Sequence, residues 1–189
     1  MVVSGTEELL RRGFFRWVAV RFRYTRTDGK DSGEVEHLVL ERGDSVGVVL
    51  HDLQTDEIVL VEQLRIATLE TSNGFLLEFP AGRIDASEQP IHAAIREAKE
   101  ETGAELSDVQ LISSFYLSPG TCSERLHLFY CPFLDGLTVK ATGGLESEHE
   151  DLKVHRISLD QAMTMVGSGE IADAKTIIGV LWLKGARRP

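Results

Sequence analysis

The spacing of apolar positions separates an N-terminal β region from the rest of the chain. Apolar side chains between residues 14 and 24 alternate with the two-residue period of a strand, and Thr27-Asp28-Gly29-Lys30 is typical of a hairpin turn. Two or three strands are expected over residues 14–42, and Gly43-Asp44 then interrupts the pattern. We therefore expect residues 1–43 to form an antiparallel β appendage.

Residues 44–189 show the pattern of a mixed α+β domain. Strands are predicted over residues 46–51, 57–64, 75–79, 109–117, 126–133 and 152–157. Two C-terminal helices are expected over residues 159–166 and 172–184. This order predicts an α+β fold in which a mixed β-sheet is sandwiched between helices.

The clearest helical pattern lies between residues 87 and 103. Ser87 is a candidate N-cap, Pro90 falls in the first turn, and Gly103 is typical of a helix end. The apolar positions recur with helical spacing at Ile91, Ala94, Ile95 and Ala98. This stripe predicts the face of the helix that packs against the sheet.

Composition and charge narrow the function classes. The chain is 42% hydrophobic and 26% charged, as is ordinary for a globular protein, and it carries a formal charge of −10. That charge would repel nucleic acid, and no apolar stretch is long enough to span a bilayer. Cys122 and Cys131 form no disulfide framework, and no secretory signal is visible. We expect a cytoplasmic protein with a small-molecule substrate and neither a nucleic-acid nor a membrane partner.

Acidic residues gather on one flank of the predicted helix. Glu97 and Glu101 are an i, i+4 pair, and Glu100 is adjacent. Like charges at this spacing destabilise a helix by a few tenths of a kcal/mol, so a counter-charge is expected. Oxygen ligands of this kind suit Mg²⁺ or Mn²⁺ better than zinc. The alternative is a solvated acidic face paired with Arg96 and Lys99.

A fixed spacing of residues surrounds these glutamates. The segment from Gly82 to Ala104 reads G-x5-E-x7-R-E-U-x-E-E-x-G-U, where U is apolar. Seven fixed residues would match by chance on the order of once in 10⁸–10⁹ start positions. The segment resembles the Nudix box. The resemblance implies the Nudix fold and hydrolysis of a nucleoside diphosphate linked to another group.

The resemblance also implies roles within the box. Glu97 and Glu101 correspond to the principal magnesium ligands, helped by the backbone carbonyl of Ala81. Glu100 corresponds to a residue that holds a further cation directly or through water. Arg96 corresponds to a structural arginine that orients the glutamates.

Residues outside the box resemble those of bacterial ADP-ribose pyrophosphatases over nearly the whole chain. The resemblance implies that Arg65 clamps the diphosphate and that Glu124 faces the terminal ribose. Phe14 and Phe15 resemble an aromatic pair that stacks on adenine, in the partner's site of a homodimer that exchanges appendages. The remaining candidate substrate contacts are His37, Arg42, Arg83, Ser118, Pro119 and Gly120. His37 stands where close relatives carry an arginine, and Arg83 replaces a residue that is often apolar.

An acidic loop at residues 143–151 resembles the mobile loop that closes over the substrate in this subfamily. By position, Glu148 corresponds to the residue that activates water, and Glu150 to one that contacts metal when the loop is closed. His149 is the second candidate for the catalytic base.

Taken together, these resemblances imply magnesium-dependent hydrolysis of ADP-ribose to AMP and ribose 5-phosphate. Two alternatives stay open. The first is hydrolysis of another nucleoside diphosphate sugar, such as GDP-mannose or UDP-glucose. The second is a non-catalytic domain that binds ADP-ribose, which the complete set of box glutamates and the lack of a basic DNA-binding domain disfavour.

Overall fold

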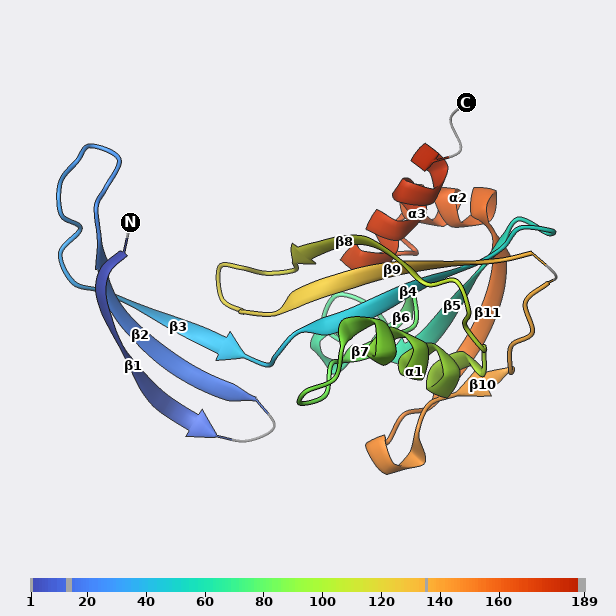
Figure 1. The fold of residues 1–189 in the computed structure, drawn as a ribbon, viewed down its shortest axis with the longest axis horizontal. Helices are drawn as coiled ribbons and strands as arrows, with labels where there is room; N and C mark the ends of the chain where they lie inside the picture. Colours follow the sequence, from blue (N-terminus) through green and yellow to red (C-terminus); the bar gives the residue numbers. More distant parts are fainter. Residues whose placement is uncertain (1, 13–14, 135, 187–189) are drawn as a thin grey trace. The chain divides into compact units, whose positions relative to one another are not determined.

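The computed structural model describes residues 2–12, 15–134 and 136–186 (Figure 1). The chain divides into two compact units. The first extends to Asp44 and also contains Tyr116–Arg125, and the second contains Ser45–Phe115 and the chain from Leu126 onward. The first unit is therefore discontinuous in sequence.

The first unit is built on a three-stranded antiparallel sheet in the order β1-β2-β3. Its strands are β1 (Val2–Arg12), β2 (Arg16–Tyr24) and β3 (Val35–Glu41). The predicted turn joins β2 to β3, and Gly29 has the positive φ of 82° that it requires. The expected antiparallel appendage is confirmed, whereas β1 adds a strand that the sequence pattern did not predict.

A loop from later in the chain is hydrogen-bonded to this sheet. The Leu40 N–H donates to the Thr121 carbonyl (2.8 Å), and the Ser123 N–H donates to the Leu40 carbonyl (3.1 Å). Leu40 and Cys122 form a parallel bridge. The segment Tyr116–Arg125 therefore belongs structurally to the appendage, although both its neighbours in sequence belong to the second unit.

The second unit contains an eight-stranded mixed sheet. Its strands are β4 (Ser45–Asp52), β5 (Glu57–Leu64), β6 (Phe75–Glu78), β7 (Ala81–Arg83), β8 (Gln110–Tyr116), β9 (Arg125–Phe133), β10 (Thr142–Gly143) and β11 (Leu152–Ser158). The order is β10-β11-β5-β4-β9-β8, with β6 paired to β5 and β7 to β4. Strand β4 runs parallel to β9 and antiparallel to β5, which makes the sheet mixed.

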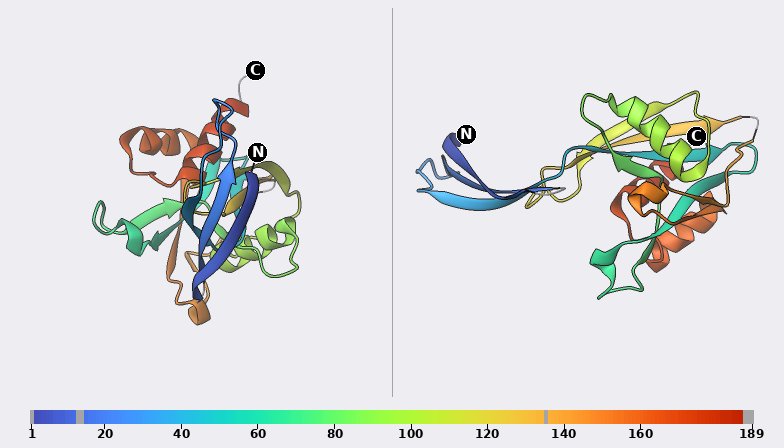
Figure 2. Two further views of the ribbon diagram at one scale, coloured as in Figure 1. Left: turned by 90° about the vertical axis from the view of Figure 1, so that its left-hand side faces the viewer. Right: turned by 90° about the horizontal axis from the view of Figure 1, so that it is seen from below.

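Helices cover both faces of this sheet (Figure 2). They are α1 (Pro90–Thr102), α2 (Leu159–Ser168) and α3 (Ala174–Ala186). One core contains Ala94 and Ala98 of α1 packed on Val48 of β4, and the other contains Val180 of α3 packed on Val49. The predicted arrangement of a mixed sheet between helices is confirmed. Among the described residues, no helix has the length and apolar character of a membrane-spanning segment.

The two central strands of the sheet diverge towards the predicted box. β4 and β5 pair with each other only at His51–Asp52. Further along, Ser45–Gly47 pairs with β7, and Val61–Leu64 of β5 pairs with β6. The short connection from β6 to β7 therefore places the start of the box between the diverging strands.

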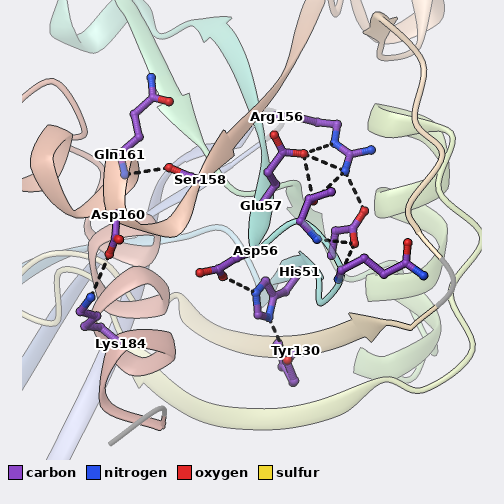
Figure 3. A network of polar contacts seen from close by, with 12 residues as sticks. His51, Asp56, Glu57, Tyr130, Arg156, Ser158, Asp160, Gln161 and Lys184 are labelled. Atoms are coloured by element: carbon purple, nitrogen blue, oxygen red, sulfur yellow. Dashed lines mark hydrogen bonds and ion pairs between the residues drawn. The ribbon is translucent and has the colours of Figure 1, made fainter.

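A network of polar contacts joins the elements at the opposite end of β4 (Figure 3). The two ring nitrogens of His51 lie 3.1 Å from the Tyr130 hydroxyl and 3.1 Å from an Asp56 carboxylate oxygen. The guanidinium of Arg156 donates to Asp52 at 2.7 Å. These side chains connect β4, β9 and β11 where the two central strands are paired.

Helix α1 begins two residues later than the sequence pattern suggested. Its N-cap is Gln89, Pro90 occupies the first turn, and Ser87 has a positive φ of 70° outside the helix. The prediction of Ser87 as N-cap was wrong, because the chain makes a turn between Ser87 and the helix. Gly103 ends the helix at φ 75°, as predicted, and its N–H donates to the Lys99 carbonyl.

The buried face of α1 also differs from the predicted stripe. Ala94 and Ala98 are buried as expected, but Ile91 is 39% exposed. The buried face is rotated towards Ala93 and the glutamates. Its buried members are Ala93, Ala94, Glu97, Ala98, Glu101 and Thr102. Small side chains let the helix approach the sheet closely, and this closeness also buries the carboxylates.

Candidate active site

Two glutamates of α1 point into the domain rather than into solvent. Glu97 is 8% exposed and Glu101 is 1% exposed. Charged side chains are rarely buried this deeply without a partner, because water solvates them far better than protein does. The alternative of a solvated acidic face is therefore wrong for this pair.

Strand β7 brings the start of the box against both glutamates. The Ala81 N–H donates to Glu101 Oε2 at 3.0 Å. The Glu97 carboxylate lies directly over Gly82, where a Cβ atom would be 2.0 Å from Glu97 Oε1. Gly82 is thus required because the carboxylate fills the space that any side chain would occupy.

Arg96 connects the loop before α1 to the glutamates on it. Its guanidinium donates to Glu88 (3.0 and 3.1 Å), to Glu97 (2.8 Å) and to Glu100 (3.1 Å). It also donates to the Arg83 carbonyl at 3.0 Å. These contacts raise the pKa of Arg96 and fix the box loop on the helix. The structural role implied for Arg96 agrees with this geometry.

Burial gives the two inner glutamates unusual acidities. The pKa of Glu97 is raised to about 7, mainly by burial; the charges of Glu100 and Glu150 add to the shift, and Arg96 opposes it. Burial also raises the pKa of Glu101 well above its ordinary value, and the nearby Glu97 charge adds to this. Both carboxyl groups are therefore costly to ionise where they lie, mainly because they are buried.

The acidic loop begins in close contact with the C-terminal end of α1. A Cβ atom at Gly143 would lie 1.7 Å from the Glu101 carbonyl oxygen, and the Gly144 N–H donates to the Glu100 carbonyl at 3.2 Å. These glycines therefore anchor the start of the loop to the helix. The Glu150 carboxylate accepts from the Leu145 N–H at 3.2 Å, which curls the loop back on itself.

The two candidate bases lie at the tip of this loop. Glu148 ends a short 3-10 helix, η2 (Glu146–Glu148), and its side chain lies outside the described part of the structure. His149 follows with a φ of 57° and is exposed. Only the backbone position of Glu148, between residues of the acidic loop, is therefore defined.

The residues near β7 and α1 form a donor set suited to a hard divalent cation. Glu97, Glu101 and the backbone of Ala81 adjoin one another, and Glu150 is near enough to raise the pKa of both glutamates. Oxygen donors with surplus negative charge fit Mg²⁺ or Mn²⁺. Within the described residues, no three His, Cys, Asp or Glu side chains converge as a ready-made metal site. The Glu97 carboxylate accepts from Arg96 through its Oε1 atom.

Arg65 follows strand β5 and is held by a residue that the sequence reasoning missed. Its Nε and Nη2 donate to the two carboxylate oxygens of Glu78 at 2.7 and 2.8 Å. Glu78 is 2% exposed, and it also accepts from Lys175 Nζ at 2.5 Å. Burial alone would raise the pKa of Glu78, but the two cations outweigh it and hold the pKa at about 2. One feature of the sequence could have indicated Glu78: it is a single glutamate at the end of an otherwise apolar strand, shortly before the box.

Three of the predicted substrate residues meet in the first unit. The guanidinium of Arg42 lies 5.2 Å from the ring centroid of Phe15, and its Nη1 lies 3.2 Å from Glu124 Oε2. A cation over an aromatic face and a paired carboxylate hold this arginine in one orientation. The structure thus brings together an aromatic ring, a cation and an anion from three separate sequence segments.

The other predicted substrate residues take different positions. Ser118 starts a turn in which its carbonyl accepts from the Thr121 and Cys122 N–H groups, and Pro119 and Gly120 are exposed within it. His37 packs edge-on against Phe22 (5.3 Å between ring centroids), apart from the Arg42 cluster in the strand register. Phe14 lies outside the described residues. Arg83 contributes its carbonyl to Arg96, and its side chain is half-buried.

The fold and the box geometry together define a family. The NUDIX domain family matches residues 41–177, which is well over half of the chain. This chain belongs to the Nudix hydrolase family, whose members generally use divalent metal ions.

Several known proteins resemble it closely. An ADP-ribose pyrophosphatase from Escherichia coli (strain K12) is 39% identical over 178 residues, covering 94% of this chain and 85% of the relative. One from Haemophilus influenzae is 34% identical over 182 residues, covering 94% and 83%. A GDP-mannose pyrophosphatase from Shigella flexneri is 32% identical over 182 residues, covering 94% and 92%. A solved ADP compounds hydrolase shares the fold, with a TM-score of 0.73, 21% identity and coverage of 100% and 96%.

Proposed function

We propose that this chain hydrolyses the pyrophosphate bond of ADP-ribose to give AMP and ribose 5-phosphate. The observation that carries the proposal is the buried pair Glu97 and Glu101 against Ala81 in a complete Nudix box. Its relatives named ADP-ribose pyrophosphatase are 39% and 34% identical, against 32% for the GDP-mannose pyrophosphatase, which supports this substrate over other nucleoside diphosphate sugars.

The proposed cofactor is Mg²⁺, with Mn²⁺ as the alternative. Glu97, Glu101, Glu150 and the Ala81 carbonyl would hold it, and Glu100 would contribute directly or through water. When bound, the cation would neutralise the charge of the diphosphate and lower the pKa of the attacking water.

The chain's own residues would position the diphosphate and accept a proton. Arg65 is proposed to bind the diphosphate through its guanidinium, whose Nη1 makes no hydrogen bond to any described residue. Glu148 is proposed to take the proton of the attacking water, because a carboxylate held by a cation is a weak base. Phe15, Arg42 and Glu124 are proposed to contact the adenine and ribose parts of a substrate, together with Phe14, His37, Arg83 and Ser118-Pro119-Gly120.

A substrate panel tests the assignment of ADP-ribose. Initial rates are measured with Mg²⁺ on ADP-ribose, GDP-mannose, UDP-glucose and NADH. We expect kcat/KM for ADP-ribose to exceed the others at least tenfold, or about 1.4 kcal/mol of barrier. A higher value for GDP-mannose would establish the second candidate, which the 32% identical GDP-mannose pyrophosphatase favours. Tight binding of ADP-ribose without hydrolysis of any of the four would establish a binding domain instead.

The assignment of Glu148 as base is tested by a pair of variants in one loop. Glu148→Gln is expected to lower kcat strongly with little change in KM, since it removes an interaction made only in the transition state. Glu146→Gln, in the same 3-10 helix, is the matched control and should be mild. Equal losses in the two variants, or a larger loss in His149→Ala, would reject Glu148.

A homodimer is the proposed assembly, with Phe14 and Phe15 serving the partner's site. A symmetric dimer would let each appendage complete the other copy's substrate contacts. Light scattering at micromolar concentration is expected to give twice the chain mass, and a fully active monomer would exclude this arrangement.

Both cysteines, Cys122 and Cys131, are free thiols, which supports the proposal of a cytoplasmic location.

A further inference from the structure

A chain of ionic contacts runs from the beginning of α3 to Arg65. Asp173 Oδ2 accepts from the Thr176 N–H at 2.9 Å and from the Thr176 hydroxyl at 2.6 Å, which fixes Asp173 at the start of the helix. Asp173 Oδ1 lies 3.1 Å from Lys175 Nζ. The same Nζ donates to Glu78 Oε2, and Glu78 in turn accepts two hydrogen bonds from Arg65. The order of contacts is therefore Asp173, Lys175, Glu78, Arg65.

Lys175 and Glu78, in the middle of this series of contacts, are buried, whereas Arg65 at its end is only half-buried. Lys175 is 6% exposed and Glu78 is 2% exposed, whereas the Arg65 side chain is 41% exposed. A lysine is rarely buried this deeply, and its cost is offset only by good ionic contacts. Two parallel hydrogen bonds from Arg65 to Glu78 fix the plane of the guanidinium. The buried pair thus sets the orientation of the half-buried Arg65.

Glu78 accepts hydrogen bonds from cations on two sides. Lys175 Nζ donates to it from the buried side and is itself held by Asp173, whereas Arg65 donates to both of its carboxylate oxygens. These two acidic and two basic side chains carry no net charge, so Lys175 acts on Arg65 through geometry. Because Lys175 holds the carboxylate of Glu78 in place, the guanidinium of Arg65 keeps a fixed orientation.

We infer that Lys175 is a positioning residue that acts through Glu78 on Arg65, readying that guanidinium for the diphosphate. This inference rests on the proposed function, which gives Arg65 a diphosphate to bind. A purely structural lysine would instead stabilise the start of α3 and leave substrate binding unchanged.

A double-mutant cycle tests whether Lys175 acts through Arg65. The values of kcat and KM for ADP-ribose with Mg²⁺ are measured for Lys175→Met, Arg65→Ala and the double variant. We expect Lys175→Met to raise KM about tenfold while kcat changes less than about threefold. In the Arg65→Ala background the same substitution should change KM less than about twofold, because its target is gone. Lys184→Met is the control, since Lys184 lies on the same helix and pairs with Asp160 at the surface.

Equal KM increases from Lys175→Met in both backgrounds would overturn the inference, as would an unchanged KM in the single variant. If Lys175→Met does not fold, Asp173→Asn decides. Asparagine caps a helix as well as aspartate but loses the ion pair to Lys175. It should raise KM about threefold with Arg65 present and leave it unchanged without Arg65. If the wild type prefers another nucleoside diphosphate sugar, the proposed substrate is wrong, and the cycle on that sugar still tests Lys175.

Discussion

Two buried carboxylates at opposite ends of the same domain have opposite acidities. At the paired end of the central strands, Asp52 accepts from the backbone N–H groups of Leu137 and Gln54 and from Arg156. Burial alone would raise the pKa of Asp52, yet these donors hold it below its ordinary value. At the diverging end, Glu101 accepts one backbone hydrogen bond, and its pKa is raised well above the ordinary value.

The difference separates an end of the domain whose charges stabilise the fold from the end at which we propose that a metal ion binds. Asp52 is surrounded by enough donors that its charge stabilises the fold. Glu101 lies beside another carboxylate, and its charge is a cost to the fold that the proposed cation would offset. A folded protein keeps such a cost at a site that needs it for chemistry.

The largest effect is expected from removing the charge at the diverging end. Glu101→Gln should lower kcat at least a hundredfold, which corresponds to about 2.7 kcal/mol of barrier, because it removes a proposed magnesium ligand. The metal-free variant should be at least as stable as the wild type, since a buried like-charge contact with Glu97 is lost. Steady-state kinetics and urea unfolding with EDTA measure the two effects. Near-normal turnover would remove Glu101 from the metal site.

The corresponding substitution at the paired end, Asp52→Asn, should lower stability and leave turnover nearly unchanged. Asp52→Asn leaves Arg156 without its buried partner and is expected to lower the free energy of unfolding by about 2 kcal/mol. The kcat of the folded variant should stay within about twofold of the wild type. Urea unfolding and kinetics on the same samples test this pair of expectations. A variant with full stability and impaired turnover would contradict our assignment of the two ends.

A steric substitution sharpens the comparison at the box loop. Gly82→Ala places a Cβ atom where the Glu97 carboxylate lies and is expected to lower kcat/KM about tenfold, or about 1.4 kcal/mol. Gly167→Ala is the control, because a Cβ atom at Gly167 of α2 meets nothing within 4 Å. That control should leave turnover unchanged. Full activity in Gly82→Ala would show that Glu97 moves aside at no cost.

The smallest effect is expected on stability at low pH, where Glu78 loses its charge. Its folded pKa of about 2 lies below its ordinary value of 4.5, so the stability it contributes is present above pH 4.5 and is lost as the pH falls towards 2. Between pH 5 and pH 3.5 the wild type should lose roughly 1.2 kcal/mol more of its unfolding free energy than Glu78→Gln. Urea unfolding across this pH range measures the difference. Parallel pH profiles would show that the pKa of Glu78 is not depressed.

The parts predicted from the sequence are those set by local spacing. The box placed Glu97 and Glu101 on one side of a helix, and Gly103 ended that helix where expected. The contact between Glu78 and Lys175 joins residues 97 positions apart, and no local pattern encodes such a pair. The prediction that Ile91 lies on the buried face was wrong for a related reason. Periodicity defines an apolar stripe, but close packing through small side chains decides which edge of it is buried.

The loop Tyr116–Arg125 has a consequence for how the protein can change over evolution. Because this loop packs with the N-terminal sheet, Phe15, Arg42 and Glu124 belong to one compact body, while the box and Arg65 belong to another. Each body has its own packing, so substitutions in one need not disturb the other. A descendant gene can therefore alter the proposed adenine and ribose contacts in small steps while the box stays unchanged. A deletion of residues 1–44 would instead leave Glu124, and with it part of this proposed surface, behind.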